Sequence, residues 1–381
     1  MKAADIFKEG DEGVKRAYWL LLIAILFALI LRHPHVEGSG DPGSHYSLLP
    51  LALASDAGDG HPEGCLIVVP RDYPTIQEAV QASCSGGVVE VHSGVYYENV
   101  RVDRQITLRG VDSGQGLPVI DAMDWVSAVT LLYDGINLEN FVMTNSGLGS
   151  GVEVRSHCNV IKNNTVTGNS LNGMKFKGRV IGNVVAWNEI YQNGFSGIVF
   201  EDGAEDNLVA ENEIKENGFE GIAFAGAATG NQVLGNTISY NGFDGILFRG
   251  RAMNNVVAGN TAFNNSFGGI DLIGNASYNL FADNRLINNS FTGLSLSNLT
   301  SENLLLANLF IQNLENNAYD TGIKNHWDNG CFGNFYSDFP CEDKNGDGIC
   351  DSPCYIPGGM GKDGAPLATF VSVFRPEDIA L

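Results

Sequence analysis

An acidic segment near the C-terminus has the residue types and spacing of a calcium-binding loop. Oxygen-bearing side chains stand at offsets 1, 3, 5 and 9, a glycine stands at offset 6, and the residue at offset 7 can offer its backbone carbonyl. In chain order these are Asp343, Asn345, Asp347, Gly348, Ile349 and Asp351. Alternate oxygens can converge on one hard cation because the glycine permits a sharp turn between them. The sequence therefore predicts a structural calcium site at Asp343, Asn345, Asp347, Ile349 and Asp351.

This loop departs from the usual pattern at its last position. Offset 12 is Cys354, where a bidentate glutamate would be expected. We therefore expect modest affinity, in the range of about 0.1–1 mM known for extracellular modules, with Asp338, Glu342 or Asp363 completing the site. The alternative is a solvated acidic turn without metal, because the same residues are also good turn formers.

A second set of residues has the composition of a sugar-processing site. Asp244, Arg249 and Asp271 lie within one stretch of the chain. Glycoside hydrolysis uses two carboxylates about 5–10 Å apart, whereas uronate lyases and epimerases combine a base with a cation or an arginine. Charged residues on an exposed β-face are more often only solvated. We therefore favour a protein without a catalytic centre and keep these three residues as the catalytic alternative.

The elements that position these residues are repeats of 24 residues. Three asparagine columns keep this spacing through seven repeats. They are Asn159, Asn183, Asn207, Asn231, Asn255, Asn279 and Asn303; Asn164, Asn188, Asn212, Asn236, Asn260, Asn284 and Asn308; and Asn169, Asn193, Asn217, Asn241, Asn265, Asn289 and Asn313. Asparagine tolerates left-handed backbone and its amides can stack in hydrogen-bonded columns. The columns predict the corners of a stacked coil.

Apolar columns keep the same register. Phenylalanines recur at Phe195, Phe219, Phe243, Phe267 and Phe291, and each is followed by a Gly-Ile-x-Phe type strand with alternate inward side chains. The pattern predicts an all-β, right-handed parallel β-helix with 24-residue coils. A leucine-rich horseshoe has a similar repeat length, but its LxxLxL frame is absent. Five outward residues could stack on sugar rings or on a partner: Val199, Leu247, Tyr191, Phe263 and Tyr240.

The N-terminal part supplies further predicted elements. Thr75 and Glu78 form a capping box before an apolar face at Ile76, Ala79 and Val80, which predicts a short helix that closes one end of the coil. Alternating residues at 86–91, 99–103 and 105–109 predict the first strands.

The chain begins with features of a membrane protein. Residues 17–31 are an uninterrupted apolar run flanked by basic residues, which predicts a transmembrane or signal anchor, although cleavage as a signal peptide stays open. We expect residues 1–16 in the cytoplasm, residues 32–64 as a flexible linker, the β-helix over residues 65–326, and a cysteine-rich C-terminal cap over residues 327–381. The bulk of the protein would then lie outside the cell or on the periplasmic side.

Charge and cysteines agree with that location. The formal charge of −22 repels phosphate backbones, so nucleic acid is excluded as a partner. Seven cysteines follow the apolar run, and the sequence-local pairing is Cys65–Cys84, Cys331–Cys341 and Cys350–Cys354, with Cys158 as a buried apolar filler. The alternative is a zinc site formed by the last four cysteines. The absence of a CxxC spacing argues against it.

Three segments carry a resemblance to a known family. They are YPTIQEAVQAS with the strands after it, the NGFxGIxF coils, and the tail WDNG, GNFYSD, DKNGDGICDSPCYI and GKDGAPL. Over roughly residues 65–370 the chain resembles the pectin-lyase-like parallel β-helices, specifically NosD-like surface proteins with carbohydrate-binding and sugar-hydrolysis repeats. The resemblance implies an extracellular or periplasmic protein that meets a polysaccharide or surface glycan. The family mixes enzymes with non-enzymes, so fold alone does not decide the function.

Our interpretation of the sequence is a membrane-anchored β-helix with a glycan-binding or structural role at the cell surface. A polysaccharide lyase, epimerase or hydrolase that uses one long face is the first alternative. A protein-interaction scaffold is the second, and it would show a continuous apolar stripe on the outer face.

Overall fold

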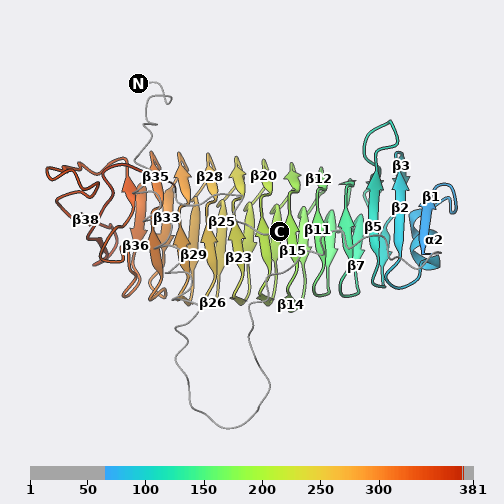
Figure 1. Ribbon diagram of the computed structural model, residues 1–381, viewed down its shortest axis with the longest axis horizontal. Helices are drawn as coiled ribbons and strands as arrows, with labels where there is room; N and C mark the ends of the chain where they lie inside the picture. The colour runs from blue at the N-terminus through green and yellow to red at the C-terminus, as the bar shows by residue number, and fades with distance from the viewer. Residues whose placement is uncertain (1–64, 371, 373–381) are drawn as a thin grey trace, which may run out of the picture. The chain divides into compact units, whose positions relative to one another are not determined.

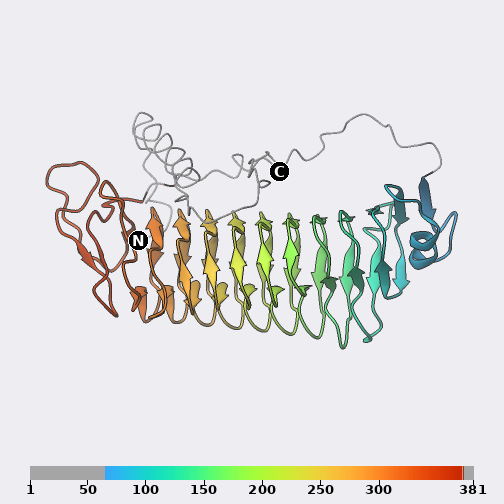
Figure 2. The same cartoon turned by 90° about the horizontal axis from the view of Figure 1, so that it is seen from below.

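The computed structural model describes residues 65–370 and residue 372, and these form a solenoid of parallel β-strands (Figure 1). The strands of successive coils lie side by side, and Figure 2 shows from the side how the coils follow one another along the solenoid axis. Two sheets contain 11 strands each and a third contains 10, and every strand within them pairs in parallel with its neighbours. The predicted parallel β-helix is confirmed.

The three long sheets, called A, B and C, follow one another around each coil. Sheet A consists of β1 (Leu66–Val69), β2 (Val88–His92), β5 (Thr107–Val111), β8 (Asn137–Glu139), β11 (Val160–Lys162), β15 (Val184–Ala186), β19 (Leu208–Ala210), β23 (Gln232–Leu234), β27 (Val256–Ala258), β31 (Leu280–Ala282) and β34 (Leu304–Leu306). Sheet B consists of β3 (Val95–Tyr97), β6 (Val119–Asp121), β9 (Val142–Thr144), β12 (Thr165–Thr167), β16 (Glu189–Tyr191), β20 (Glu213–Lys215), β24 (Thr237–Ser239), β28 (Thr261–Phe263), β32 (Arg285–Ile287), β35 (Leu309–Ile311) and β37 (Phe335–Tyr336). Sheet C consists of β4 (Val100–Val102), β7 (Val129–Leu131), β10 (Val152–Val154), β13 (Met174–Phe176), β17 (Ile198–Phe200), β21 (Ile222–Phe224), β25 (Ile246–Arg249), β29 (Ile270–Ile273), β33 (Thr292–Leu296) and β36 (Asn316–Asp320).

Short strands form a fourth side between sheets C and A. They are β14 (Val180–Ile181), β18 (Ala204–Glu205), β22 (Ala228–Thr229), β26 (Ala252–Met253) and β30 (Ala276–Ser277). An antiparallel pair, β38 (Cys354–Tyr355) and β39 (Lys362–Asp363), lies in the C-terminal segment. Because β37 pairs with β35, the chain after residue 326 still contributes a strand to the solenoid.

The core is a stack of layers that repeat with each coil. Phe176, Phe200, Phe224 and Phe248 stack with ring centroids 4.4–4.7 Å apart and are at most 1% exposed. This spacing is that of neighbouring strands in a sheet. Each inward position of the 24-residue repeat therefore packs on its own copy in the next coil.

The asparagine columns form buried hydrogen-bonded ladders. The side-chain Nδ2 and the backbone N–H of each asparagine donate to Oδ1 of its copy in the next coil, as from Asn207 to Asn231 at 2.9 and 3.0 Å. All three ladders lie at corners, as predicted. The left-handed backbone lies one residue earlier than expected, because the residue before each ladder asparagine has positive φ, including Trp187, Glu211 and Tyr240. The bend at that preceding residue leads the chain around the corner, while the asparagine itself satisfies buried donors and acceptors.

Each ladder ends on an aspartate in the C-terminal part. Asn325 closes the first ladder and donates to Asp320 at 3.0 Å. Asn334 closes the second and donates to Asp363 from its backbone N–H at 2.7 Å. In the third ladder Asn317 donates to Asp338 at 2.6 Å. A carboxylate suits this place because the last amide of a one-directional ladder has donors and no further asparagine oxygen to receive them.

The predicted helix α2 runs over Ile76–Ala82 and lies beside β1 at one end of the solenoid (Figure 1). The Thr75 hydroxyl accepts from the Glu78 N–H, and Ile76, Ala79 and Val80 are buried. That this helix closes the coil stays a prediction. Residues 1–64, with the predicted anchor over 17–31, lie outside the described part of the chain. Among the residues that are described, no helix has the length and apolar character needed to span a membrane.

Candidate functional site

A ridge of five phenylalanines runs along the corner between sheets B and C. Its members are Phe195, Phe219, Phe243, Phe267 and Phe291, with centroids of successive rings 4.5–6.3 Å apart. Each ring is 36–45% exposed. The repeat identified these residues as an apolar column, and the structure places them on the turn between the ladder asparagine and the next strand. The outcome is a half-exposed aromatic surface, which we call the phenylalanine ridge.

A row of polar residues follows the phenylalanine ridge one position later in the chain. It contains Ser196, Glu220, Asp244, Thr292 and Asn316, with Gly268 in the gap between the third and fourth. The Ser196 hydroxyl donates to Glu220 at 2.7 Å, and the Gly268 N–H donates to Asp244 Oδ1 at 2.8 Å. A Cβ at Gly268 would lie only 2.8 Å from Asp244 Oδ1, so the glycine provides the space in which this carboxylate lies. We call these residues the polar row.

Asp271 stands beside the polar row on the outer face of sheet C. Its strand position pairs with Leu247 of the preceding coil and Ser295 of the following one. Asp271 is 7% exposed and Asp244 is 3% exposed. Burial, followed by repulsion from Asp271, raises the pKa of Asp244 to about 7. Burial also raises the pKa of Asp271, against the hydrogen bond from Ser295. Two desolvated carboxylates with raised pKa values in one place mark a functional-site candidate.

The structure brings together the three residues that we named as the catalytic alternative. The Arg249 charge lowers the pKa of both Asp244 and Asp271, so all three lie within electrostatic reach. Sequence reasoning missed Glu220, which raises the pKa of Asp244 as well. The sequence feature that could have revealed Glu220 is its spacing of 24 residues from Asp244, which places the two acidic residues in one column.

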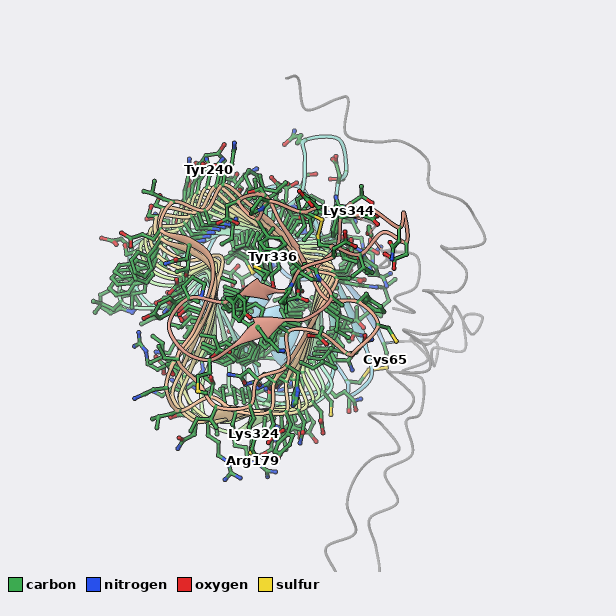
Figure 3. All side chains as sticks on the ribbon, turned by 90° about the vertical axis from the view of Figure 1, so that its left-hand side faces the viewer. Cys65, Arg179, Tyr240, Lys324, Tyr336 and Lys344 are labelled. Atoms are coloured by element: carbon green, nitrogen blue, oxygen red, sulfur yellow. A yellow bond between two sulfur atoms is a disulfide. The ribbon has the colours of Figure 1, made fainter. Side chains whose placement is uncertain are left out.

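The predicted aromatic and apolar contact residues differ in exposure. Leu247 is buried at 2% exposed, so it offers no contact surface. Val199, Tyr191 and Phe263 are half-buried. Tyr240 is 56% exposed and lies at the outer edge of the solenoid when it is viewed along its axis (Figure 3).

The predicted calcium loop is mostly exposed, and a disulfide between Cys341 and Cys350 ties the chain just before it to its penultimate residue. Its carboxylates accept hydrogen bonds from the loop itself: Asp343 from the N–H groups of Gly346 and Gly348, and Asp351 from that of Lys344. Asp338 and Asp363, which we expected to complete the site, close asparagine ladders instead. Across residues 65–370, no group of three or more histidine, cysteine, aspartate or glutamate side chains is placed to hold a metal. Calcium binding, with the Asn345 amide and the Ile349 carbonyl among the ligands, stays a prediction.

The cysteine pairing is partly as predicted. Cys65–Cys84 is confirmed. The pairs Cys331–Cys341 and Cys350–Cys354 are wrong, because Cys341 joins Cys350 and leaves Cys331 and Cys354 free. The turn of the acidic loop brings its two ends together, which sequence proximity alone did not indicate. Cys158 is exposed and not a core filler, because it holds a left-handed corner position at φ 56°.

Comparison with known proteins agrees with the fold. Residues 127–286 match the family model described as a right handed beta helix region. This part of the chain is a right-handed parallel β-helix. No curated protein sequence matches the chain.

Several solved structures are similar. The A-module of the Azotobacter vinelandii mannuronan C-5 epimerase AlgE6 has 16% identity and a TM-score of 0.46, covering 68% of this chain and 87% of that one. The tailspike protein gp49 from Acinetobacter baumannii bacteriophage Fri1, a capsular polysaccharide depolymerase, has 10% identity and a TM-score of 0.43, covering 69% and 64%. These likenesses are too distant to assign an activity to the present β-helix.

Proposed function

We propose that this β-helix binds a linear glycan along the phenylalanine ridge, without turnover. The observation that carries the proposal is the repetition of one half-exposed aromatic ring per coil over five coils. Successive rings stack and cover much of each other's faces, so their exposed edges form an apolar strip on which the C–H groups of a sugar chain can pack. A ligand that itself repeats can meet such a surface in register.

The negative charge of the protein indicates which class of glycan it can bind. The chain carries a formal charge of −22, and Glu220, Asp244 and Asp271 lie beside the phenylalanine ridge. A polyanionic glycan would be repelled by this surface, so we favour a neutral one. The proposal has two further parts. An anchor at residues 17–31 displays the β-helix outside the cell, and calcium bound in the C-terminal loop stiffens that end of the protein.

Sugar-chain cleavage or epimerisation is the second candidate, and the pair Asp244 and Asp271 favours it. With a pKa of about 7, Asp244 holds a proton at neutral pH for much of the time and would act as the acid. Asp271 would then act as the ionised partner, with Arg249 available to a substrate carboxylate. Both carboxylates are less than 8% exposed, however, whereas the phenylalanine rings are open to solvent. Binding therefore ranks before catalysis.

The scaffold alternative rests on the outer face of sheet A, where outward side chains from β15 onward are apolar except Gln232. Several of them are closed to solvent, with Ala186 at 1% and both Ala210 and Leu306 at 0% exposed. This face offers a partner less accessible area than the phenylalanine ridge does. We therefore place the scaffold role third.

A binding experiment with paired variants tests the proposal. The protein is incubated with immobilised neutral and anionic polysaccharides, and both retained protein and newly formed reducing or unsaturated ends are measured. The double variant Phe219→Ala with Phe243→Ala should lose retention. Its matched control, Tyr133→Ala with Tyr278→Ala, removes two exposed rings at other corners of the solenoid and should keep it. Turnover that disappears in Asp271→Asn would replace the binding proposal with the enzyme candidate.

A further inference from the structure

A small cavity lies at the C-terminal end of the corner that carries the phenylalanine ridge. Its volume is about 180 Å³, and it is lined in part by Asn316, Tyr336, Asp338, Phe339, Tyr355 and Pro357. Asn316 belongs to β36, the last strand of sheet C, and Tyr336 belongs to β37, the last strand of sheet B. The other four residues come from the C-terminal segment. Figure 3 views the solenoid from this end and shows Tyr336 within the ring of coils.

The cavity continues the surface of the proposed glycan site. Thr292 of the polar row pairs in register with Asn316, so the row leads into the cavity. The phenylalanine ridge stops one coil earlier, because the position after Phe291 is Glu315, whose N–H donates to the Phe291 carbonyl at 2.8 Å. A ligand that follows the ridge toward the C-terminus therefore meets the cavity next.

The C-terminal segment closes the far side of this path. The backbone N–H of Asp320, at the end of β36, donates to the Pro357 carbonyl at 2.8 Å. Cys354 and Tyr355 of β38 border the same cavity. The phenylalanine ridge is open along its length, whereas this end has a wall. A linear ligand can therefore end here but has no continuing surface beyond.

The lining has the chemistry of a site for one sugar ring. Phe339 and Tyr355 offer aromatic surface, and Tyr355 is 75% exposed at the mouth. Asn316 and Asp338 supply amide and carboxylate groups for hydroxyls, and Asp338 is fixed by the 2.6 Å hydrogen bond from Asn317. Pockets for drug-sized ligands measure about 300–1,000 Å³, so a cavity of about 180 Å³ suits a single ring.

We propose that this cavity binds the terminal sugar of a neutral glycan whose following units lie along the phenylalanine ridge. The inference rests on the proposed function and adds an end preference to it: the protein recognises where a chain stops. Short oligosaccharides, which are rich in ends, then depend on the cavity. Long polymers, which have few ends, depend on the phenylalanine ridge.

The test measures the affinity of the full chain for gluco-, manno- and N-acetylglucosamine oligosaccharides of two to six units and for the matching long polymers. Tyr355→Ala and Asn316→Ala should each weaken oligosaccharide binding by about fivefold or more, because each removes an aromatic or hydrogen-bonding contact worth roughly 1 kcal/mol. Polymer retention should change less than about twofold. Tyr133→Ala, an exposed tyrosine elsewhere, is the matched control. Reduction of the terminal sugar to its alditol then tells whether the reducing end is the one bound.

The possible outcomes separate the two proposals. Equal loss of oligosaccharide and polymer binding in the cavity variants, or no loss of either, overturns end recognition. Unchanged polymer binding in the Phe219→Ala and Phe243→Ala double variant overturns the ridge proposal, even where the cavity variants still lose oligosaccharides. A parent protein that binds none of these probes overturns both. Because Tyr355 is exposed, thermal unfolding of Tyr355→Ala should match that of the parent and exclude misfolding.

Discussion

Replacing Asp244 by asparagine should stabilise the protein at alkaline pH. In the fold its carboxylate is 3% exposed and near Asp271, and its pKa rises from 3.8 to about 7. A raised pKa means that the folded state binds the proton more tightly than the unfolded state does. The stability that the protonated Asp244 carboxyl contributes is therefore fully present below about pH 4, and it is lost as the pH rises to about 7. At 1.36 kcal/mol per pH unit, the loss amounts to roughly 4 kcal/mol.

An asparagine at this position cannot ionise, and its amide oxygen can still accept the hydrogen bond from Gly268. The free energy of unfolding of Asp244→Asn should exceed that of the parent by up to about 4 kcal/mol at pH 8, and the two should converge near pH 4. Urea unfolding midpoints at pH 4.5, 6 and 8 measure this difference. If the variant lowers the midpoint at pH 8, or if the difference is the same at every pH, the burial argument is wrong.

Asp202→Asn is the matched control. Asp202 also accepts from a glycine N–H of a neighbouring coil, that of Gly178 at 2.9 Å, but it is exposed. Its replacement should change stability by no more than about 0.5 kcal/mol at any of the three pH values. If both variants gain stability in parallel, the gain reflects the net charge of the chain and not the burial of Asp244.

Three further perturbations test other parts of the structure. Asp363→Ala should lower the unfolding free energy by about 2–5 kcal/mol, measured by urea unfolding, because it leaves buried donors at the end of the second asparagine ladder without an acceptor. Phe224→Ala should cost about 3–5 kcal/mol through a cavity in the core stack, whereas Phe219→Ala on the phenylalanine ridge should cost less, as thermal melts will show. If the acidic loop binds calcium at about 0.5 mM, then 5 mM calcium should add about 1.4 kcal/mol to unfolding, and Asp343→Asn with Asp351→Asn should abolish the gain in calorimetry.

The fold could be predicted from the sequence because every coil of a solenoid repeats the same local structure. An asparagine that recurs every 24 residues must meet its own copy, so the ladders and the core phenylalanines followed from spacing alone. The repeat does not say which way a turn residue points. For that reason periodicity identified Phe195 and its copies as an apolar column, but only the structure shows that they are half-exposed.

The candidate site could be predicted only in part from the sequence. Asp244, Arg249 and Asp271 were found as charged residues in adjacent coils, but their burial depends on neighbours, such as the space left by Gly268. The left-handed corners were assigned to the asparagines because of residue preference, whereas the structure places this backbone at Trp187, Tyr240 and other residues that rarely adopt it. The terminal aspartates and the end cavity lie where the repeat breaks down, so periodicity carried no information about them.

Retention of neutral polysaccharides by the parent protein and by the Phe219→Ala and Phe243→Ala double variant tests the central claim most directly. Glycan binding along the phenylalanine ridge predicts that the parent retains at least one neutral polymer without releasing new chain ends. It also predicts that the double variant loses this retention, whereas the Tyr133→Ala and Tyr278→Ala control keeps it. Equal retention by all three proteins, or release of new ends by the parent, would contradict it.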